Sequence, residues 1–220
     1  MLLCLEGLNK VYSTNSTKVQ ALSQVSLSLN EGDFVAVQGP SGSGKSTLLF
    51  TAGTMLAPDA GKVSILGESP YAMPANESAA FRAKHIGFVF QQFHLVPYLN
   101  VSENVQAASL GLPASKRMTN SKVEQLLDQF GLTGRSRHYP SQLSVGERQR
   151  CCIARALLND PKLVLADEPS GSLDESNAQI VLQELRRFSN AGGAVLLVTH
   201  DSRAAQLADR VVYMKNGVLS

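Results

Sequence analysis

Residues 39–47 carry the strongest chemical signal in this sequence, a glycine-rich run that ends in lysine, serine and threonine. The run consists of Gly39, Pro40, Ser41, Gly42, Ser43, Gly44, Lys45, Ser46 and Thr47, and it fits the phosphate-loop pattern G-x-x-x-x-G-K-[ST]. Its glycines let the backbone curl so that successive N–H groups face a phosphate. Lys45 can then reach the β- and γ-phosphates, and the Ser46 hydroxyl can bind Mg²⁺. The run predicts a site for nucleotide phosphates and a magnesium ion.

A pair of carboxylates, Asp167 and Glu168, directly follows the apolar run from Leu163 to Ala166. Side chains at the carboxyl end of such a buried strand lie in the crevice where open α/β sheets bind ligands. Asp167 is placed there to hold Mg²⁺, and Glu168 is placed to polarise a water molecule against the γ-phosphate. The alternative is a pair of solvated loop acids, but the nearby phosphate loop favours the catalytic interpretation.

Ser144, Val145, Gly146 and Glu147 begin a helical stretch. Ser144 and Glu147 have the spacing of a capping box, in which each side chain bonds to the backbone N–H of the other residue. A helix start with a serine hydroxyl and a glycine is also an anion site. Both interpretations can hold at once, so this segment is a second candidate for phosphate contact.

The elements that must position these residues follow from hydrophobic patterning. Val25–Leu29 alternates apolar and polar residues, which predicts a half-buried strand. Phe34–Val37, Leu163–Ala166 and Ala194–Val198 are apolar throughout, which is typical of strands buried on both faces. Helical stretches lie between these runs, so we expect a mainly parallel sheet.

The helix after the phosphate loop should be amphipathic. Its apolar residues fall on one face and are Leu48, Leu49, Ala52, Met55 and Leu56. Pro58 is the expected end of this helix, because proline cannot continue it. Near the other end of the sequence, Asn216-Gly217 predicts a hairpin over residues 211–219.

Residues 93–158 have few strand signals and much helical patterning. The apolar residues that share one helical face there are Val123, Leu126, Leu127 and Phe130. Gly131 is placed to end that helix. We interpret this stretch as a helical lobe inserted into the sheet domain.

Bulk composition narrows the class of protein. With 220 residues, the chain is long enough for one large domain, or for a core with one inserted lobe. The net charge of +2 is too small for a nucleic-acid-binding surface, so no nucleic acid partner is expected. The first residues have no basic leader, and no apolar run approaches the ~18 residues that a membrane span needs.

The cysteines Cys4, Cys151 and Cys152 make a poor disulfide framework, because their number is odd and two of them are adjacent. We expect Cys151 and Cys152 to be small buried or half-buried residues. A soluble, intracellular and reduced chain follows, in which the glycosylation patterns at Asn15, Asn76 and Asn100 have no meaning.

The order of these motifs resembles the nucleotide-binding domain of ABC transporters. The phosphate loop comes first, Leu143-Ser144-Val145-Gly146-Glu147 comes later, and Leu165-Ala166-Asp167-Glu168-Pro169 follows shortly after. The resemblance covers residues 2–219 and implies an α/β fold, with a P-loop NTPase (RecA-like) core of mainly parallel sheet, an N-terminal antiparallel β subdomain and an inserted α-helical lobe. It implies one domain over residues 1–220, with 1–92 and 159–220 as the nucleotide-binding core and 93–158 as the lobe.

The same resemblance implies roles residue by residue. Tyr12 resembles the aromatic residue that stacks on adenine, and Gln91 resembles the glutamine that senses Mg²⁺ and the attacking water. His200 resembles the histidine that contacts the γ-phosphate, and Asp174 lies in the loop that signals across a dimer. The implied catalytic residues are Glu168, His200 and Gln91. The implied magnesium ligands are Ser46, Gln91 and Asp167.

In this family two subunits bind two ATP molecules head to tail, which implies a homodimer that forms on ATP binding. The signature of one subunit, Ser144, Val145, Gly146 and Glu147, then contacts the ATP held by the other. Val145 stands where glycine is commonest, a change that could slow turnover, and Gly146 must let the backbone approach the phosphate. Ser170 stands where threonine is usual, which is a minor change.

Residues 87–97 and 100–105 resemble the subunits of lipoprotein-release and macrolide-efflux systems and the related cell-division ATPase. This implies an ATP-hydrolysing subunit, cytoplasmic and peripheral on the inner face of the cell membrane, that drives export or lipoprotein release through separate permease chains. The expected permease contact is the apolar run of Phe93, Leu95, Val96, Pro97 and Tyr98. The other interpretation of this run is core of the helical lobe.

Three other functions fit parts of the pattern. A regulatory or scaffolding subunit would bind ATP with little turnover, as in the cell-division relatives. An ABC ATPase of DNA repair or translation would carry a long coiled coil or a second cassette, and this sequence has neither. A small-molecule kinase would need a lid for its acceptor substrate and has no reason to carry the signature.

Overall fold

The computed structural model describes residues 1–13 and 17–220, so the asparagine motif at Asn15 lies outside the described residues. In the described part, strands alternate with helices along the chain. The strands are β1 (Leu3–Ser13), β2 (Lys18–Leu29), β3 (Phe34–Gln38), β4 (Ala60–Ile65), β5 (Ile86–Val89), β6 (Leu163–Asp167), β7 (Ala194–Thr199), β8 (Arg210–Lys215) and β9 (Val218–Leu219). The α-helices are α1 (Lys45–Ala52), α2 (Ala75–His85), α3 (Val101–Gln106), α4 (Asn120–Gln129), α5 (Val145–Leu157), α6 (Glu175–Asn190) and α7 (Ser202–Ala205).

The central sheet has the strand order β5-β6-β7-β3-β8-β9, and all its neighbouring strands are parallel except β8 and β9. The apolar runs predicted as buried strands form β3, β6 and β7. Asn216 and Gly217 join β8 to β9 with φ of 49° and 78°, the left-handed backbone that a two-residue hairpin turn requires. The predicted parallel sheet and terminal hairpin are therefore confirmed.

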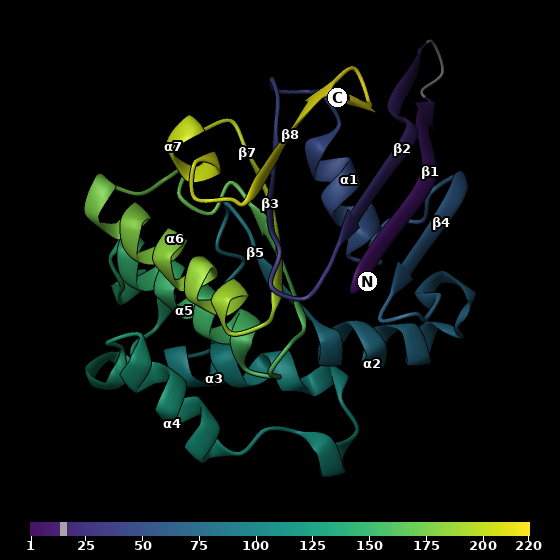
Figure 1. Cartoon of the computed structure of the whole chain (residues 1–220). Coiled ribbons are helices and arrows are strands. Elements are labelled where there is room, and N and C mark those ends of the chain that lie inside the picture. The colour runs from purple at the N-terminus through teal and green to yellow at the C-terminus, as the bar shows by residue number, and fades with distance from the viewer. Residues whose placement is uncertain (14–16) are drawn as a thin grey trace.

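Helices cover the two faces of this sheet (Figure 1). α1 lies between the central sheet and a smaller antiparallel sheet of order β2-β1-β4, whereas α5 and α6 lie on the opposite face. Because successive residues of a strand point to opposite faces, β3 contributes Val35 and Val37 to the core around α1. Its Phe34 and Ala36 join the core around α5 and α6. The predicted fold class is confirmed.

Strand β2 begins at Lys18 and not at Val25, where the alternating pattern first predicts a strand. The first residues of β2 are exposed, so they show little hydrophobic signal. Its pairing with β1 also shifts register between Leu5 and Leu8 and again up to Val11. Such bulges disturb the two-residue period on which the prediction relied.

Helix α1 is shorter than predicted. It ends before Gly53, and Met55 is 51% exposed instead of continuing the apolar face. A Cβ on Gly53 would lie 2.4 Å from the ring of Phe88, so the chain packs closely on β5 at this point. Thr54 then has a φ of 60°, which a right-handed helix cannot contain. The helix has therefore ended well before Pro58.

Residues 93–158 contain α3, α4, α5 and several 3-10 turns, without a strand. Helix α3 begins with a capping box, because the Asn100 side chain accepts from the Glu103 N–H at 2.9 Å and Glu103 accepts from the Asn100 N–H at 2.8 Å. Gly131 follows α4 with a φ of 63°, as predicted for the end of that helix. The exact limits of a lobe over this range remain a prediction.

Cys151 and Cys152 are buried in α5, as predicted, and burial raises the pKa of each thiol to about 12. Cys4 is partly exposed, and all three thiols are free. Among the helices that the structure describes, none has the length and apolar character needed to cross a bilayer.

The hairpin β8–β9 is hydrogen-bonded to the phosphate loop and to β2. The Gly217 N–H donates to the Ser43 carbonyl at 2.9 Å, and the Ser23 N–H donates to the Gly217 carbonyl at 2.8 Å. Strand β3, which leads into the loop, pairs with β7 on one side and β8 on the other. Segments that are far apart in the sequence thus build this region together.

Gly87 in β5 provides a test of the packing beneath α5. A Cβ at this position would lie 2.4 Å from the Ala156 carbonyl oxygen. Gly87→Ala should therefore lower the free energy of unfolding by about 1–3 kcal/mol in a denaturant titration. The control is Gly134→Ala, whose added Cβ meets nothing within 4 Å and which should change stability by less than about 0.5 kcal/mol. Equal losses in the two variants would contradict this packing.

Candidate nucleotide-binding site

The phosphate loop joins β3 to α1 along a path that only glycine allows at several points. Gly42 and Gly44 have φ of 76° and 107°. A Cβ on Gly39 would lie 2.1 Å from the Met214 carbonyl oxygen, and one on Gly44 would lie 2.2 Å from the Ala21 carbonyl oxygen. The loop is therefore in direct contact with the backbones of β8 and β2.

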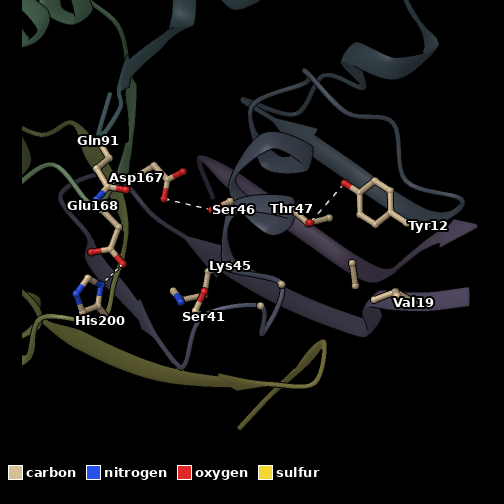
Figure 2. Close-up of a pocket in the computed structure, with 13 residues that line it drawn as sticks. Tyr12, Val19, Ser41, Lys45, Ser46, Thr47, Gln91, Asp167, Glu168 and His200 are labelled. Atoms are coloured by element: carbon tan, nitrogen blue, oxygen red, sulfur yellow. Dashed lines mark hydrogen bonds and ion pairs between the residues drawn. The ribbon is translucent and has the colours of Figure 1, made fainter. Parts of the chain in front are cut away.

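Lys45 is the first residue of α1, and its side chain turns back over the loop (Figure 2). Its Nζ donates to the Gly39 carbonyl at 2.8 Å and to the Pro40 carbonyl at 3.0 Å. The residue is only 8% exposed. A nearly buried ammonium group at the positive end of a helix is suited to an anionic phosphate.

Ser46 and Asp167 face each other from α1 and β6 (Figure 2). The Ser46 hydroxyl donates to Asp167 Oδ1 at 3.4 Å. Burial raises the pKa of the Asp167 carboxyl, and the nearby Glu168 carboxylate raises it further, while Ser46 and Lys45 act in the opposite direction. A hydroxyl and a partly buried carboxylate are hard oxygen donors of the kind that Mg²⁺ prefers. These residues therefore fit a magnesium site.

Glu168 is held by two neighbouring side chains at the end of β7. Its Oε1 lies 2.7 Å from His200 Nδ1, and its Oε2 accepts from the Thr199 hydroxyl at 3.0 Å. Its backbone φ is 46°, which is uncommon outside glycine. Sequence reasoning missed Thr199, although a hydroxyl between a buried strand and His200 was a usable signal.

One open pocket of about 640 Å³ brings most of the predicted residues together. Its lining consists of Tyr12, Val19, Ala21, Ser41, Gly42, Gly44, Lys45, Ser46, Thr47, Gln91, Asp167, Glu168 and His200. Figure 2 shows Tyr12 and Val19 on one side of the phosphate loop, with Glu168 and His200 on the other. The Tyr12 hydroxyl lies 3.5 Å from the Thr47 hydroxyl. We refer to this cavity as the nucleotide pocket.

Two lining residues, Val19 and Ala21, were missed because the early part of β2 was not predicted as a strand. Gly39, Pro40 and Ser43 belong to the loop but do not line the pocket. The signature residues 144–147 and Asp174 are also absent from its lining. These predicted contacts therefore lie outside the pocket in two other segments, at the starts of α5 and α6.

The signature begins α5 with the predicted capping box. The Glu147 N–H donates to the Ser144 hydroxyl at 3.2 Å, and the Ser144 N–H donates to Glu147 Oε2 at 2.8 Å. The Ser144 backbone bond is the main reason why the pKa of Glu147 falls to about 2, and the Arg135 guanidinium lowers it further. Val145 is 44% exposed at this helix start.

Gly146 meets a neighbour in its own subunit. A Cβ there would lie 2.2 Å from Asn177 Oδ1, at the start of α6. The sequence interpretation gave this glycine only the role of letting the backbone approach a phosphate. The structure adds an internal reason for glycine, because the Asn177 side chain occupies the space that a Cβ would need.

Asp174 caps α6 within its own subunit. It accepts from the Asn177 N–H at 3.0 Å, the Ser176 hydroxyl at 2.7 Å and the Asn177 side-chain amide at 2.7 Å. These donors, led by the Asn177 backbone, hold the pKa of Asp174 well below its usual range. Its role in signalling across a dimer remains a prediction.

Comparisons with known proteins agree with this fold and pocket. A sequence profile of the ABC transporter family matches residues 22–171. The lipoprotein-releasing system ATP-binding protein LolD of Shewanella denitrificans is 41% identical over 220 residues, which are 100% of this chain and 94% of LolD. The macrolide export ATP-binding/permease protein MacB of Wolinella succinogenes is 39% identical over 216 residues, which are 98% of this chain and 34% of MacB.

Solved structures give the same answer. A dimeric structure of MJ0796, a bacterial ABC transporter cassette, has a TM-score of 0.90 and 35% identity to this chain, and the match covers 100% of this chain and 97% of that one. A post-hydrolysis state of the MJ0796 dimer bound to ADP and Pi matches equally well, with a TM-score of 0.90.

The chain belongs to the ABC transporter family, as one of its ATP-binding subunits. The resemblance inferred from the motifs is thereby confirmed, including its similarity to lipoprotein-release and macrolide-export proteins. The roles of individual residues remain predictions.

The raised pKa of Asp167 predicts that its ionised carboxylate lowers the stability of the protein when neither nucleotide nor metal is bound. Because the folded chain binds the Asp167 proton more tightly than the unfolded chain, stability falls as the pH rises through the folded pKa. Asp167→Asn should therefore raise the Tm in EDTA at pH 7, with a gain that shrinks as the pH is lowered. The same variant should lose the Mg²⁺-dependent part of nucleotide affinity, measured by titration calorimetry. A lower Tm across the whole pH range would contradict this account.

Proposed function

We propose that this chain hydrolyses ATP, and that two copies close around two ATP molecules to drive separate membrane permease subunits. The proposal rests on the nucleotide pocket, where Lys45, Asp167 and Glu168 line one cavity from α1 and the end of β6. The names of the relatives support ATP as the nucleotide, since LolD and MacB are both ATP-binding proteins.

In the proposed reaction, Glu168 is the general base. Its two carboxylate oxygens are oriented by His200 and Thr199 at 2.7 Å and 3.0 Å, so it is positioned to accept a proton from an attacking water molecule. Gln91 lines the same pocket and is expected to orient that water. His200 is expected to contact the γ-phosphate as well.

The remaining pocket residues bind and neutralise the nucleotide in this proposal. Tyr12 is 43% exposed at the edge of the pocket and offers its ring to adenine. Lys45 and the loop N–H groups bind the phosphates. Ser46, Asp167 and Gln91 would hold Mg²⁺, which supplies positive charge against the phosphate oxygens when bound.

The proposed dimer gives the signature its function. Ser144 and Val145 are exposed and lie outside the pocket of their own subunit, so they are free to contact the ATP of a second copy. The similar MJ0796 cassette is a dimer in the two solved structures, one of which contains ADP and Pi. We infer that this chain closes as a homodimer on ATP binding.

A groove of about 390 Å³ is the proposed docking site for the permease. Met55, Phe90, His94 and Arg155 are among its lining residues. The apolar run predicted as the contact does not line this groove, and Leu95 packs against the core around α5. Tyr98 at the end of that run is 78% exposed, so the run stays a predicted contact, and we add the groove, which includes His94, to the proposed docking surface.

The names of the relatives suggest two transport systems. LolD belongs to a lipoprotein-releasing system, and MacB combines an ATP-binding protein with a permease for macrolide export. The match covers 34% of MacB and 94% of LolD. We propose lipoprotein release or export, with the chain on the cytoplasmic face of the cell membrane.

Glu168→Gln tests the proposed chemistry. We expect the ATP turnover of purified protein to fall by about 10²–10⁴-fold, the scale for loss of a general base. ATP affinity should persist, because Lys45 and the loop are unchanged. Normal turnover in the variant would remove Glu168 from the catalytic role. A wild-type protein that binds ATP without turnover would favour the regulatory alternative.

The same variant reports on the dimer by size-exclusion chromatography. Glu168→Gln protein should shift from monomer to dimer only with ATP, and adding Ser144→Arg should abolish the shift. A monomer under both conditions would mean that the isolated chain does not close on ATP.

Met55→Glu tests the groove. The change places a charge at an exposed lining residue, so folding and the ATPase activity of the isolated chain should be unaffected. In the membrane complex, it should weaken co-purification with the permease by at least about tenfold, on the scale of burying an unpaired charge. The matched control is Val211→Glu, at a position on β8 that is 48% exposed and outside the groove. Equal co-purification of both variants would place the permease elsewhere.

A further inference from the structure

Helix α5, which begins at the signature, is hydrogen-bonded to the chain that follows Glu168. Gln149 Nε2 donates to the Pro169 carbonyl at 2.7 Å, and Pro169 is the next residue after Glu168. Arg150 Nη1 donates to Asn177 Oδ1 at 3.1 Å. Helix α5 is thus attached to both ends of the segment over residues 168–177, which consists of a loop and the first turn of α6.

The same helix is also attached to the chain that follows Gln91. Arg155 donates to the carbonyls of Phe93 and His94 at 2.8 Å and 2.7 Å, and Cys152 Sγ lies 3.0 Å from the Phe93 carbonyl. Two polar residues of the nucleotide pocket, Gln91 and Glu168, are therefore each followed by backbone that α5 holds.

Gln149 is almost completely buried, although its side chain is polar. It is 1% exposed, and its Oε1 has no hydrogen-bond partner within the described residues. A buried amide oxygen without a hydrogen-bond partner lowers the free energy of unfolding, so an apolar side chain of the same volume would avoid this loss of stability. Its Nε2 bond to Pro169 is what a hydrophobic side chain of similar volume could not supply.

The backbone turn at Glu168 couples the hydrogen bond between Gln149 and Pro169 to the position of the Glu168 side chain. Glu168 has a φ of 46°, and the Gly171 N–H donates to the Glu168 carbonyl at 3.0 Å, so the residues form a tight turn. The Pro169 carbonyl belongs to that turn. A displacement of this carbonyl must therefore alter the backbone from which the Glu168 side chain projects.

We propose that Gln149 is a positioning residue. Through it, the position of the signature helix α5 determines the position of the Glu168 carboxylate in the same subunit. The inference rests on the proposed ATP-closed dimer, in which the signature contacts the nucleotide of the other copy. Seating of the signature fixes α5, and the bond from Gln149 to Pro169 carries that position to Glu168. Engagement at one ATP site thus prepares the carboxylate at the other.

The test compares two glutamines of the full-length protein that each have a buried side-chain oxygen without a hydrogen-bond partner. Gln149→Met removes the donor to Pro169 and also the unpaired oxygen, so its two effects on stability oppose each other. Gln106→Met is the matched control, because Gln106 also has an unpaired Oε1 and donates to the Met118 carbonyl at 2.8 Å, in α3 away from the nucleotide pocket. For each variant, kcat and KM for ATP, the Tm without nucleotide, and the ATP-dependent dimer in the Glu168→Gln background are measured.

We expect Gln149→Met to lower kcat by about 10- to 100-fold, the scale for displacing a catalytic group by about 1 Å. KM, Tm and the ATP-dependent dimer should match those of Gln106→Met. An unchanged kcat would overturn the proposal, and so would a loss of Tm and dimer formation beyond that of the control, because Gln149 would then act only in folding. Absence of turnover in the wild-type protein would instead overturn the proposed function, and this inference with it.

Gln149→Glu supplies a second readout that a purely structural role would not give. A protonated carboxyl can donate to the Pro169 carbonyl, whereas a carboxylate cannot. The kcat of this variant relative to wild type should therefore fall as the pH rises through the pKa of the new carboxyl, while that of Gln106→Glu stays level. A constant ratio for Gln149→Glu at about the wild-type rate would contradict the proposal.

Discussion

Backbone contact around the phosphate loop is the constraint on which the rest of the structure depends. Gly39 and Gly44 let the loop touch the carbonyls of β8 and β2, where a Cβ would lie about 2 Å from oxygen. This contact places α1 between the two sheets and turns the Lys45 ammonium group over the loop. The ends of β6 and β7 then bring Asp167, Glu168 and His200 to the same cavity.

The sequence predicts the strands that are buried on both faces, but it does not predict element ends that tertiary contacts determine. The strands β3, β6 and β7 are apolar throughout because both faces of the sheet are covered, so composition alone identifies them. The end of α1 depends on how Gly53 meets the Phe88 ring, and the start of β2 depends on bulges opposite β1. Neither contact leaves a local pattern in the sequence.

The residues of the candidate site also fall into those that short motifs predict and those that only tertiary contacts reveal. Lys45, Asp167 and Glu168 were predictable because each directly adjoins a buried strand or glycine loop, so short motifs contain their geometry. The hydrogen bonds of Thr199 and Gln149 join residues that are 31 and 20 positions apart, and no spacing rule connects such pairs. Which side chains of the apolar run at residues 93–98 are free for a permease also depends on tertiary packing, because Leu95 packs against the core around α5 whereas Tyr98 is 78% exposed.

The pairing of β3 has a consequence for how the chain is made. Both neighbours of β3, the strands β7 and β8, come from the last part of the sequence, and the Gly217 N–H closes the contact with Ser43. On a ribosome, the phosphate loop emerges well before the residues that support it, which are residues 194–217. Such distant pairing is slow to form and leaves strand edges exposed in the meantime. Until those residues follow, the nascent chain lacks the backbone contacts that shape its phosphate loop, and its unpaired strand edges are open to aggregation.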